Sequence, residues 1–146
     1  MDRVERLLAE KGREVVTVAP GATVYDAVKT MTDRHIGALV VERDGVPVGM
    51  FTERDVLTKI VLSCRDPRQC KVEEVMTTDV VFITPETPIR EAMAIMTTRR
   101  HRHLPVMEGK TLAGLVSIGD CTRWVSRDQD FTIKHLIHYI SDTYPG

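Results

Sequence analysis

The apolar residues of this chain follow two spacings in alternation, one typical of strands and one typical of helices. At the start, Val4, Leu7 and Leu8 lie about one turn apart, which predicts a helix over residues 2–11 that Gly12 can close. This helix stands apart from the pattern that follows it. We expect it to cover an apolar surface of its own chain or of a partner subunit.

The next fifty residues or so predict the order strand, helix, strand, strand, helix. Asp44-Gly45 separates two short apolar runs, which indicates a hairpin. The second run ends in Gly49-Met-Phe-Thr52-Glu-Arg-Asp55, where the apolar residues close a strand and Thr52 can cap the helix that follows. Asp55, three residues after Thr52, completes a pair of the capping-box kind.

The same order returns after a shift of 65 residues, without a gap, from Val15 to about Ile60. The second motif is Gly114-Leu-Val-Ser117-Ile-Gly-Asp120, so glycine, hydroxyl and acid keep their spacing. Identical pairs are Val15/Val80, Val16/Val81, Pro20/Pro85, Ala27/Ala92, Met31/Met96, Arg34/Arg99, Leu39/Leu104, Val41/Val106, Gly49/Gly114 and Asp55/Asp120. A match of this kind indicates two copies of one supersecondary unit.

A unit of about 45 residues cannot bury a sufficient core alone, so we expect the two copies to pack on each other in an α+β fold. The predicted boundaries are an N-terminal helix at 1–12, a first repeat at 13–63, a linker at 64–72, a second repeat at 73–126 and a C-terminal helix at 127–146. The apolar face of the C-terminal helix favours an oligomer contact or packing on its own domain about equally.

Composition and charge then exclude several classes of function. The chain has 146 residues, of which 42% are apolar and 28% charged, and its net charge is −1. These values are ordinary for a globular chain and give no sign of broad electrostatic binding to nucleic acid. No apolar run is long enough to span a membrane, and the first residues do not resemble a secretory signal, so we expect a cytoplasmic protein. Cys64, Cys70 and Cys121 are expected to be reduced thiols, although a bridge between the first two is geometrically possible.

The repeated motif carries chemistry that suits a ribonucleotide. A helix start presents backbone N–H groups and a positive dipole, which favour phosphate, and the hydroxyl of Thr52 or Ser117 can bond the same group. The carboxylate of Asp55 or Asp120 can accept two hydrogen bonds from the diol of a ribose. The simpler alternative is that both residues of each pair only cap their helix.

Cations near the motif would hold the phosphates. Residues 99–103, Arg-Arg-His-Arg-His, precede the middle strand of the second copy, and of these Arg102 and His103 are the strongest candidates for phosphate contact. Arg54, inside the first motif, and Lys59, one turn further along, could add charge there. The alternative is a solvated helix end, where cations also favour the carbonyl dipole.

These features together resemble a tandem pair of cystathionine-beta-synthase (CBS) domains. Each copy ends in Gly-x-x-[Ser/Thr]-x-x-Asp, and Arg102-His-Leu-Pro105 is similar to the basic-Leu-Pro segment with which gamma subunits of AMP-activated kinase grip phosphates. The match covers about residues 13–126. With Phe131-Thr-Ile133 near its end, the whole chain resembles stand-alone bacterial proteins made of one CBS pair.

The resemblance implies that the two repeats pack through their sheets about a pseudo-twofold axis and leave two clefts. Each cleft could hold an adenosine ligand, namely AMP, ADP, ATP, S-adenosylmethionine or NAD, and no cofactor would be required. Asp55 and Asp120 would take ribose hydroxyls, and Thr52 and Ser117 would take phosphate. Because Ile118-Gly119 replaces Glu53-Arg54, the cleft at Thr52, Arg54 and Asp55 would be better supplied with phosphate contacts.

The resemblance also implies where the adenine base of the ligand would lie. It would lie against the backbone at the start of the first strand of a repeat and beside the middle strand. Carried over by residue, this gives Arg13, Gly37 and Ala38 in one cleft, and Thr78 and His101 in the other. Two CBS pairs commonly join into a flat dimeric disc, so a homodimer is implied. We expect no effector domain in this chain, so that any regulated target would be another protein.

Three other functions compete with a nucleotide sensor. An enzyme lacks support, because the sequence has no nucleophile beside a predicted base, no P-loop and no dinucleotide fingerprint. Metal binding could use His101 and His103, or His135 and His138, but neither pair has an evident further ligand. The stronger competitor is a structural interaction module whose clefts stay empty.

Overall fold

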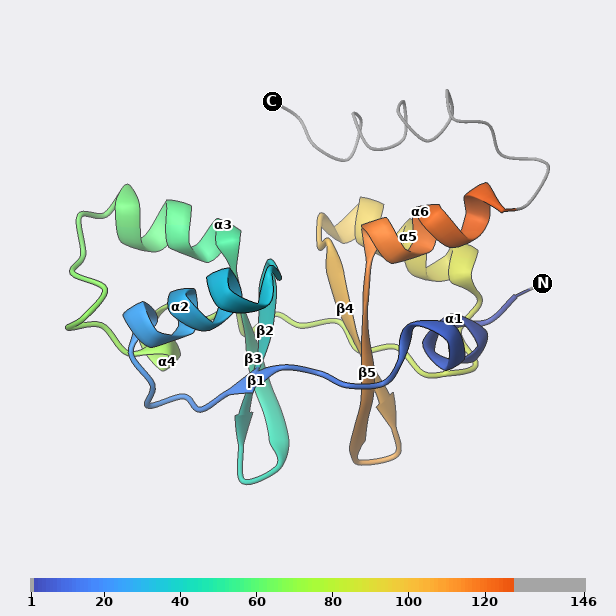
Figure 1. The fold of residues 1–146 in the computed structure, drawn as a ribbon, viewed down its shortest axis with the longest axis horizontal. Helices are drawn as coiled ribbons and strands as arrows, with labels where there is room; N and C mark the ends of the chain where they lie inside the picture. The colour runs from blue at the N-terminus through green and yellow to red at the C-terminus, as the bar shows by residue number, and fades with distance from the viewer. Residues whose placement is uncertain (1, 128–146) are drawn as a thin grey trace. The chain divides into compact units, whose positions relative to one another are not determined.

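The computed structural model describes residues 2–127 and has a mixed α+β fold (Figure 1). Within this range the chain forms two compact units. Unit 1 comprises residues 2–14, 82–109 and 113–127, and unit 2 comprises residues 15–81 and 110–112. None of the helices in the described range has the length and apolarity that a membrane span requires. The helix predicted for 127–146 falls outside the described residues, apart from its first position.

Unit 2 has the predicted order of elements. They are β1 (Thr17–Val18), α2 (Val24–Arg34), β2 (Ala38–Arg43), β3 (Val46–Thr52), α3 (Glu53–Asp55), the π-helix η1 (Val56–Val61) and α4 (Val72–Val75). Strand β1 pairs with β2 in parallel, and β2 pairs with β3 in antiparallel. The hairpin turns at Asp44 and Gly45, both with positive φ, as the Asp-Gly pair predicts.

Helix α2 shows why the sequence starts and stops its helices where it does. Thr23 caps the helix, because its Oγ1 accepts a hydrogen bond of 3.1 Å from the backbone N–H of Asp26. The helix ends at His35, which adopts the left-handed conformation at φ 54° and whose N–H returns to the last carbonyls. The left-handed residue that ends this helix is thus His35 rather than a glycine.

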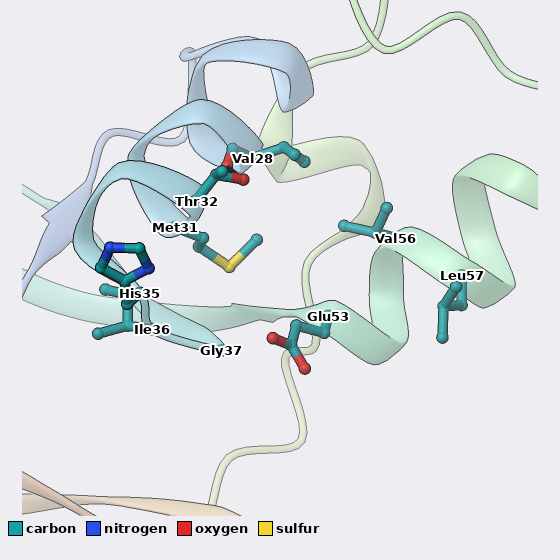
Figure 2. Close-up of a pocket in the computed structure, with 9 residues that line it drawn as sticks. All are labelled: Val28, Met31, Thr32, His35, Ile36, Gly37, Glu53, Val56 and Leu57. Carbon is teal, nitrogen blue, oxygen red and sulfur yellow. Dashed lines mark hydrogen bonds between the residues drawn. The ribbon is translucent and has the colours of Figure 1, made fainter.

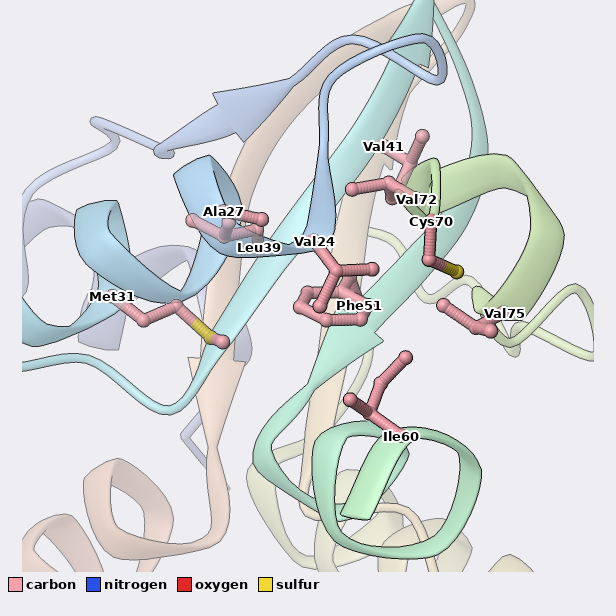
Figure 3. Packing of buried hydrophobic residues seen from close by; sticks show 10 residues of the cluster. All are labelled: Val24, Ala27, Met31, Leu39, Val41, Phe51, Ile60, Cys70, Val72 and Val75. Atoms are coloured by element: carbon pink, nitrogen blue, oxygen red, sulfur yellow. The ribbon is translucent and has the colours of Figure 1, made fainter. Parts of the chain in front are cut away.

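The core of unit 2 lies against one face of the β2–β3 hairpin (Figure 3). Leu39 and Val41 of β2 and Phe51 of β3 contribute the strand side of this core, and all three are fully buried. The helices and the segment after them contribute Val24, Ala27, Met31, Ile60, Cys70, Val72 and Val75. The residues after the first repeat thus complete its core, and Thr77 extends the sheet by two backbone hydrogen bonds to Met50, of 2.9 and 2.8 Å.

Unit 1 is built from the second repeat and the N-terminal helix. Its elements are α1 (Val4–Lys11), α5 (Ile89–Arg99), β4 (His103–Glu108), β5 (Thr111–Ser117) and α6 (Ile118–Ser126). Strands β4 and β5 form a two-stranded sheet. The first strand expected in the second repeat is reduced to one parallel bridge, between Ile83 and Val106.

Helix α1 belongs to unit 1 and covers its apolar surface, which is one of the two roles expected for it. The methyl groups of Leu8 lie over Gly114, and the Asp2 carboxylate accepts a hydrogen bond of 2.8 Å from Trp124 Nε1. The backbone carbonyl of Asp2 also accepts a hydrogen bond from the Ile89 N–H at 3.0 Å, which joins the start of α1 to the start of α5.

The three cysteines are free thiols, and no disulfide joins them. Cys64 is exposed, whereas Cys70 and Cys121 are buried.

Candidate functional site

The first motif places a buried carboxylate at the turn from β3 into α3. Asp55 is only 3% exposed. Its Oδ2 accepts the backbone N–H of Thr52 at 3.0 Å, and its own N–H donates to Thr52 Oγ1 at 3.3 Å, so the two residues form a capping box. The predicted capping pair is therefore present.

Asp55 also has two partners from further along unit 2. Thr77 Oγ1 donates to its carboxylate, 3.0 Å from Oδ1 and 3.2 Å from Oδ2. Lys59 Nζ lies 2.9 Å from Oδ1 and also donates to the backbone carbonyl of Val75 at 2.9 Å. A carboxylate has about four lone-pair sites, so a ribose diol can bind Asp55 only if one of these partners gives way.

The second motif repeats this geometry in unit 1, from β5 into α6. Asp120 Oδ2 accepts the backbone N–H of Ser117 at 2.9 Å, and the N–H of Asp120 donates to Ser117 Oγ at 3.0 Å. Two cations contact the carboxylate. Lys11 Nζ is 2.5 Å from Oδ2 and Arg123 Nη2 is 2.8 Å from Oδ1.

Electrostatics keep the Asp120 carboxylate ionised. Burial acts to raise its pKa, but the hydrogen bonds from Lys11 and from the Ser117 backbone outweigh burial, and the pKa lies below its ordinary value. The neighbouring Cys121 thiol has a pKa raised to about 12, chiefly by burial. It is therefore an inert apolar group rather than a nucleophile.

In each unit, the first backbone N–H of the helix that follows the motif strand donates to a backbone carbonyl from the segment before the middle strand. The N–H of Glu53 donates to Gly37 O at 3.0 Å, and the N–H of Ile118 donates to Arg102 O at 2.8 Å. With the N–H of the third helical residue bonded to the cap hydroxyl, each start keeps one N–H, of Arg54 or Gly119, without an intrahelical partner. An anion at either turn would meet that N–H and the hydroxyl, not a full set of free donors.

The motif glycines make room for protein rather than for a ligand ring. A Cβ added at Gly49 would lie 2.8 Å from the carbonyl oxygen of Thr77 and 2.9 Å from the sulfur of Met76. A Cβ at Gly114 would lie 2.7 and 2.9 Å from the methyl groups of Leu8. In each unit the segment that packs on the hairpin occupies this space.

The other predicted site residues are spread over both units. Unit 2 holds Gly37 and Ala38 before and at the start of β2, the exposed Arg54 in α3, and the exposed Thr78, which follows Thr77. Unit 1 holds Arg13, whose guanidinium is 3.6 Å from Glu108, and the half-buried His101. The structure thus brings Thr52 together with Asp55, and Ser117 together with Asp120.

Arg102 and His103, the last two residues of the basic run at 99–103, differ in how deeply they are buried. Arg102 is exposed, whereas His103 is half-buried at the first position of β4. Burial, together with the nearby charges of Arg102 and Lys11, lowers the pKa of His103 to about 4, against the opposing effect of Asp120. His103 is therefore neutral at neutral pH, and in that state it is a hydrogen-bonding group rather than a cation for phosphate.

A hollow of about 660 Å³ lies elsewhere in unit 2, between α2 and the start of α3 (Figure 2). Its lining is Val28, Met31, Thr32, His35, Ile36, Gly37, Glu53, Val56 and Leu57. Of the predicted nucleotide residues only Gly37 takes part, and neither Thr52 nor Asp55 lines it. Its walls are mostly apolar, with the Glu53 carboxylate and the His35 ring at its edge (Figure 2).

The sequence did not predict three partners of the motif acids, namely Thr77, Lys11 and Arg123. Thr77 and Lys11 lie before the first strand of a repeat, outside the internal match that begins at Val15. Extending the 65-residue shift by four residues would have placed Lys11 opposite Met76, next to Thr77.

Metal binding finds no support in the part of the chain that the structure describes, which holds no group of three His, Cys, Asp or Glu residues suited to an ion. His135 and His138 lie outside that part.

Comparison with known proteins agrees with the repeat. A family model described as "CBS domain" matches residues 11–62 and again residues 72–127. The CBS domain-containing protein CBSX3, mitochondrial, of Arabidopsis thaliana is 42% identical over 127 residues, which cover 84% of this chain and 62% of that protein. The CBS domain-containing protein YhcV of Bacillus subtilis (strain 168) is 35% identical over 107 residues, which cover 73% of this chain and 76% of that one.

Solved structures show the same likeness. A candidate signal-transduction protein with CBS domains from Burkholderia ambifaria MC40-6 is 43% identical, with a TM-score of 0.84 over 90% of this chain and 99% of that chain. The CBS-domain containing protein ATU1752 from Agrobacterium tumefaciens is 40% identical, with a TM-score of 0.81 over 84% and 98% of the two chains.

Proposed function

Because this chain belongs to the CBS-domain family and carries two such domains in tandem, we propose that it is a regulatory protein that binds an adenine ribonucleotide at its two motif turns. AMP, ATP or NAD is the ligand, and no cofactor is required. A partner protein responds to whether the nucleotide is bound. CBS-pair proteins are generally regulatory modules rather than enzymes, so the function of this chain lies in binding and not in turnover.

One observation carries the proposal. Each unit holds an acid that is largely withdrawn from water at a strand-to-helix turn, and each acid has an ammonium partner that is itself partly exposed. A ribose diol can replace the ammonium on the carboxylate, because it donates two hydrogen bonds to the same oxygens. The displaced ammonium then remains beside the phosphate of the same ligand.

The remaining site residues take supporting roles in this proposal. Asp55 and Asp120 bind ribose hydroxyls, and Thr52 and Ser117 bind phosphate through their cap hydroxyls. The exposed cations Arg54 and Arg102 add phosphate contacts. The residues proposed to contact the base or its surroundings are Arg13, Gly37, Ala38, Thr78, His101 and His103.

Thermal unfolding in the presence of AMP, ATP and NAD tests the proposal. A ligand that binds only the folded protein raises its stability, by about 2.7 kcal/mol at a concentration of 100 times the Kd. The variants Asp55→Ala and Asp120→Ala should each reduce this shift. Asp26→Ala is the matched control, because Asp26 stands three residues after the cap of α2, outside both motifs. If no adenine nucleotide shifts the transition, the proposal fails.

The competing function is a structural module that joins protein chains and binds nothing. The observation in its favour is the apolar surface of η1 and the residue after it, where Val61 is 60% exposed and Leu62 77% exposed, with Leu57 at 60%. This surface also supports a homodimer or contact with a regulated protein, either of which a sensor needs. The thermal-shift result separates the two functions. A cytoplasmic location stays a prediction from the sequence.

A further inference from the structure

Helix α1 reaches the second motif through one side chain. Lys11 Nζ bridges two acceptors, 2.5 Å from Asp120 Oδ2 and 2.7 Å from the backbone carbonyl of Leu115. The Lys11 side chain is 37% exposed, whereas that of Asp120 is 10% exposed. The ammonium therefore lies at the solvent side of a carboxylate that is otherwise enclosed, on a flexible four-carbon stem.

The partners of Asp120 differ in how easily they can leave. The Ser117 N–H is fixed by the capping box, so it stays while α6 is folded. Arg123 contacts the other carboxylate oxygen and its side chain is 72% exposed. A ribose diol that binds Asp120 must therefore displace Lys11 or Arg123, or share the carboxylate with both cations. Lys11 contacts Oδ2, the oxygen that also accepts the Ser117 N–H, so displacing Lys11 frees an oxygen next to the cap hydroxyl.

Whether displacing Lys11 is favourable depends on whether the ligand carries a phosphate. An uncharged nucleoside would take the carboxylate from Lys11 and offer the ammonium nothing in exchange. A ligand with a phosphate on the same ribose offers it a new anionic partner within reach of its stem. Ammonium moving from carboxylate to phosphate keeps every charge paired, so the phosphorylated ligand is preferred.

We infer that Lys11 determines the ligand class of the site around Asp120: it selects phosphorylated ribonucleosides over adenosine, which lacks a phosphate. The inference rests on the proposed function, since it concerns the same site. It assigns a binding role to a residue of α1, which lies before the first repeat.

Calorimetric titration of AMP and adenosine tests the inference in an Asp55→Ala background, where only the site around Asp120 keeps its acid. The measured quantity is the ratio of the adenosine Kd to the AMP Kd. Lys11→Met, which keeps the stem and removes the charge, should lower this ratio at least about tenfold. Lys11→Arg should preserve it. Lys29→Met, an exposed position on α2, is the control for the change in net charge.

An unchanged ratio in Lys11→Met overturns the inference while leaving the proposed function standing. If the native chain binds none of AMP, ATP, NAD and adenosine, the proposed function fails and the inference fails with it. Should the Asp55→Ala background not fold, the same titrations are run with the native Asp55. There Lys11→Met should reduce discrimination in one of the two sites, and unchanged discrimination in both contradicts the inference.

Discussion

The two motif acids are held alike by their own turns and differently by the rest of the chain. Asp55 receives its ammonium from Lys59, one turn further along the same helical segment, and a hydroxyl from Thr77. Asp120 receives its ammonium from Lys11, on a helix more than a hundred residues earlier, and a guanidinium from Arg123. In both units the ammonium also bonds a backbone carbonyl.

This difference separates what the duplication preserved from what each half acquired. The capping box follows from a hydroxyl and an acid three residues apart, so it recurs wherever the motif recurs. A buried carboxylate is costly unless a cation pairs with it, and a lysine from any nearby element can be that cation. Unit 2 uses its own helix, and unit 1 depends on the N-terminal helix.

The largest expected difference between the units concerns pH. His103 occupies the position that Ala38 holds in unit 2 under the 65-residue shift. The pKa of His103 is lowered to about 4 in the folded protein, whereas an unfolded histidine binds a proton below about pH 6.5. Between these values the unfolded state binds more protons, so the free energy of unfolding falls by roughly 3 kcal/mol as the pH drops through the window.

Urea unfolding across this window measures the effect. His103→Ala, which gives unit 1 the residue of unit 2, should remove most of the slope even though it lowers stability at neutral pH. Asp120, whose pKa is also lowered, loses its contribution only below its ordinary value of 3.8, so the two effects separate. A slope that is the same in the variant would show that His103 is not the titrating group.

The second expected difference concerns the motif glycines. Gly49→Ala should cost about 2–3 kcal/mol, because the new Cβ meets the backbone carbonyl of Thr77, which is fixed by its bonds to Met50. Gly114→Ala should cost about 1 kcal/mol, because the ends of the Leu8 side chain can shift. Chemical denaturation of both variants gives the comparison, and a larger loss for Gly114→Ala would contradict it.

These elements also show how far the sequence could predict the structure. The repeat, the hairpin turn at Asp44-Gly45 and both capping boxes depend on local spacing, and each is present as predicted. The partners Lys11 and Thr77 could not be derived in this way, because they reach the acids through tertiary packing. The space that the motif glycines leave also depends on tertiary packing, since Leu8 and Met76 are among the residues that fill it.

A smaller effect is expected from removing each ammonium. Lys11→Met should lower the free energy of unfolding by about 1–2 kcal/mol, because it leaves Asp120 with Arg123, whose side chain is mostly exposed. Lys59→Met should cost about 1 kcal/mol or less, because Thr77 still donates to both oxygens of Asp55. Equal losses in thermal unfolding would mean that the neutral hydroxyl does not compensate for the missing charge.

The central claim is that these two acids bind ribose, and the affinity for a ligand without the diol tests it most directly. Calorimetric titration of the native chain should show AMP binding at least about tenfold more tightly than its 2′,3′-dideoxy analogue, because that analogue leaves the acids without their donors. If the two ligands bind with equal affinity, Asp55 and Asp120 are helix caps and nothing more.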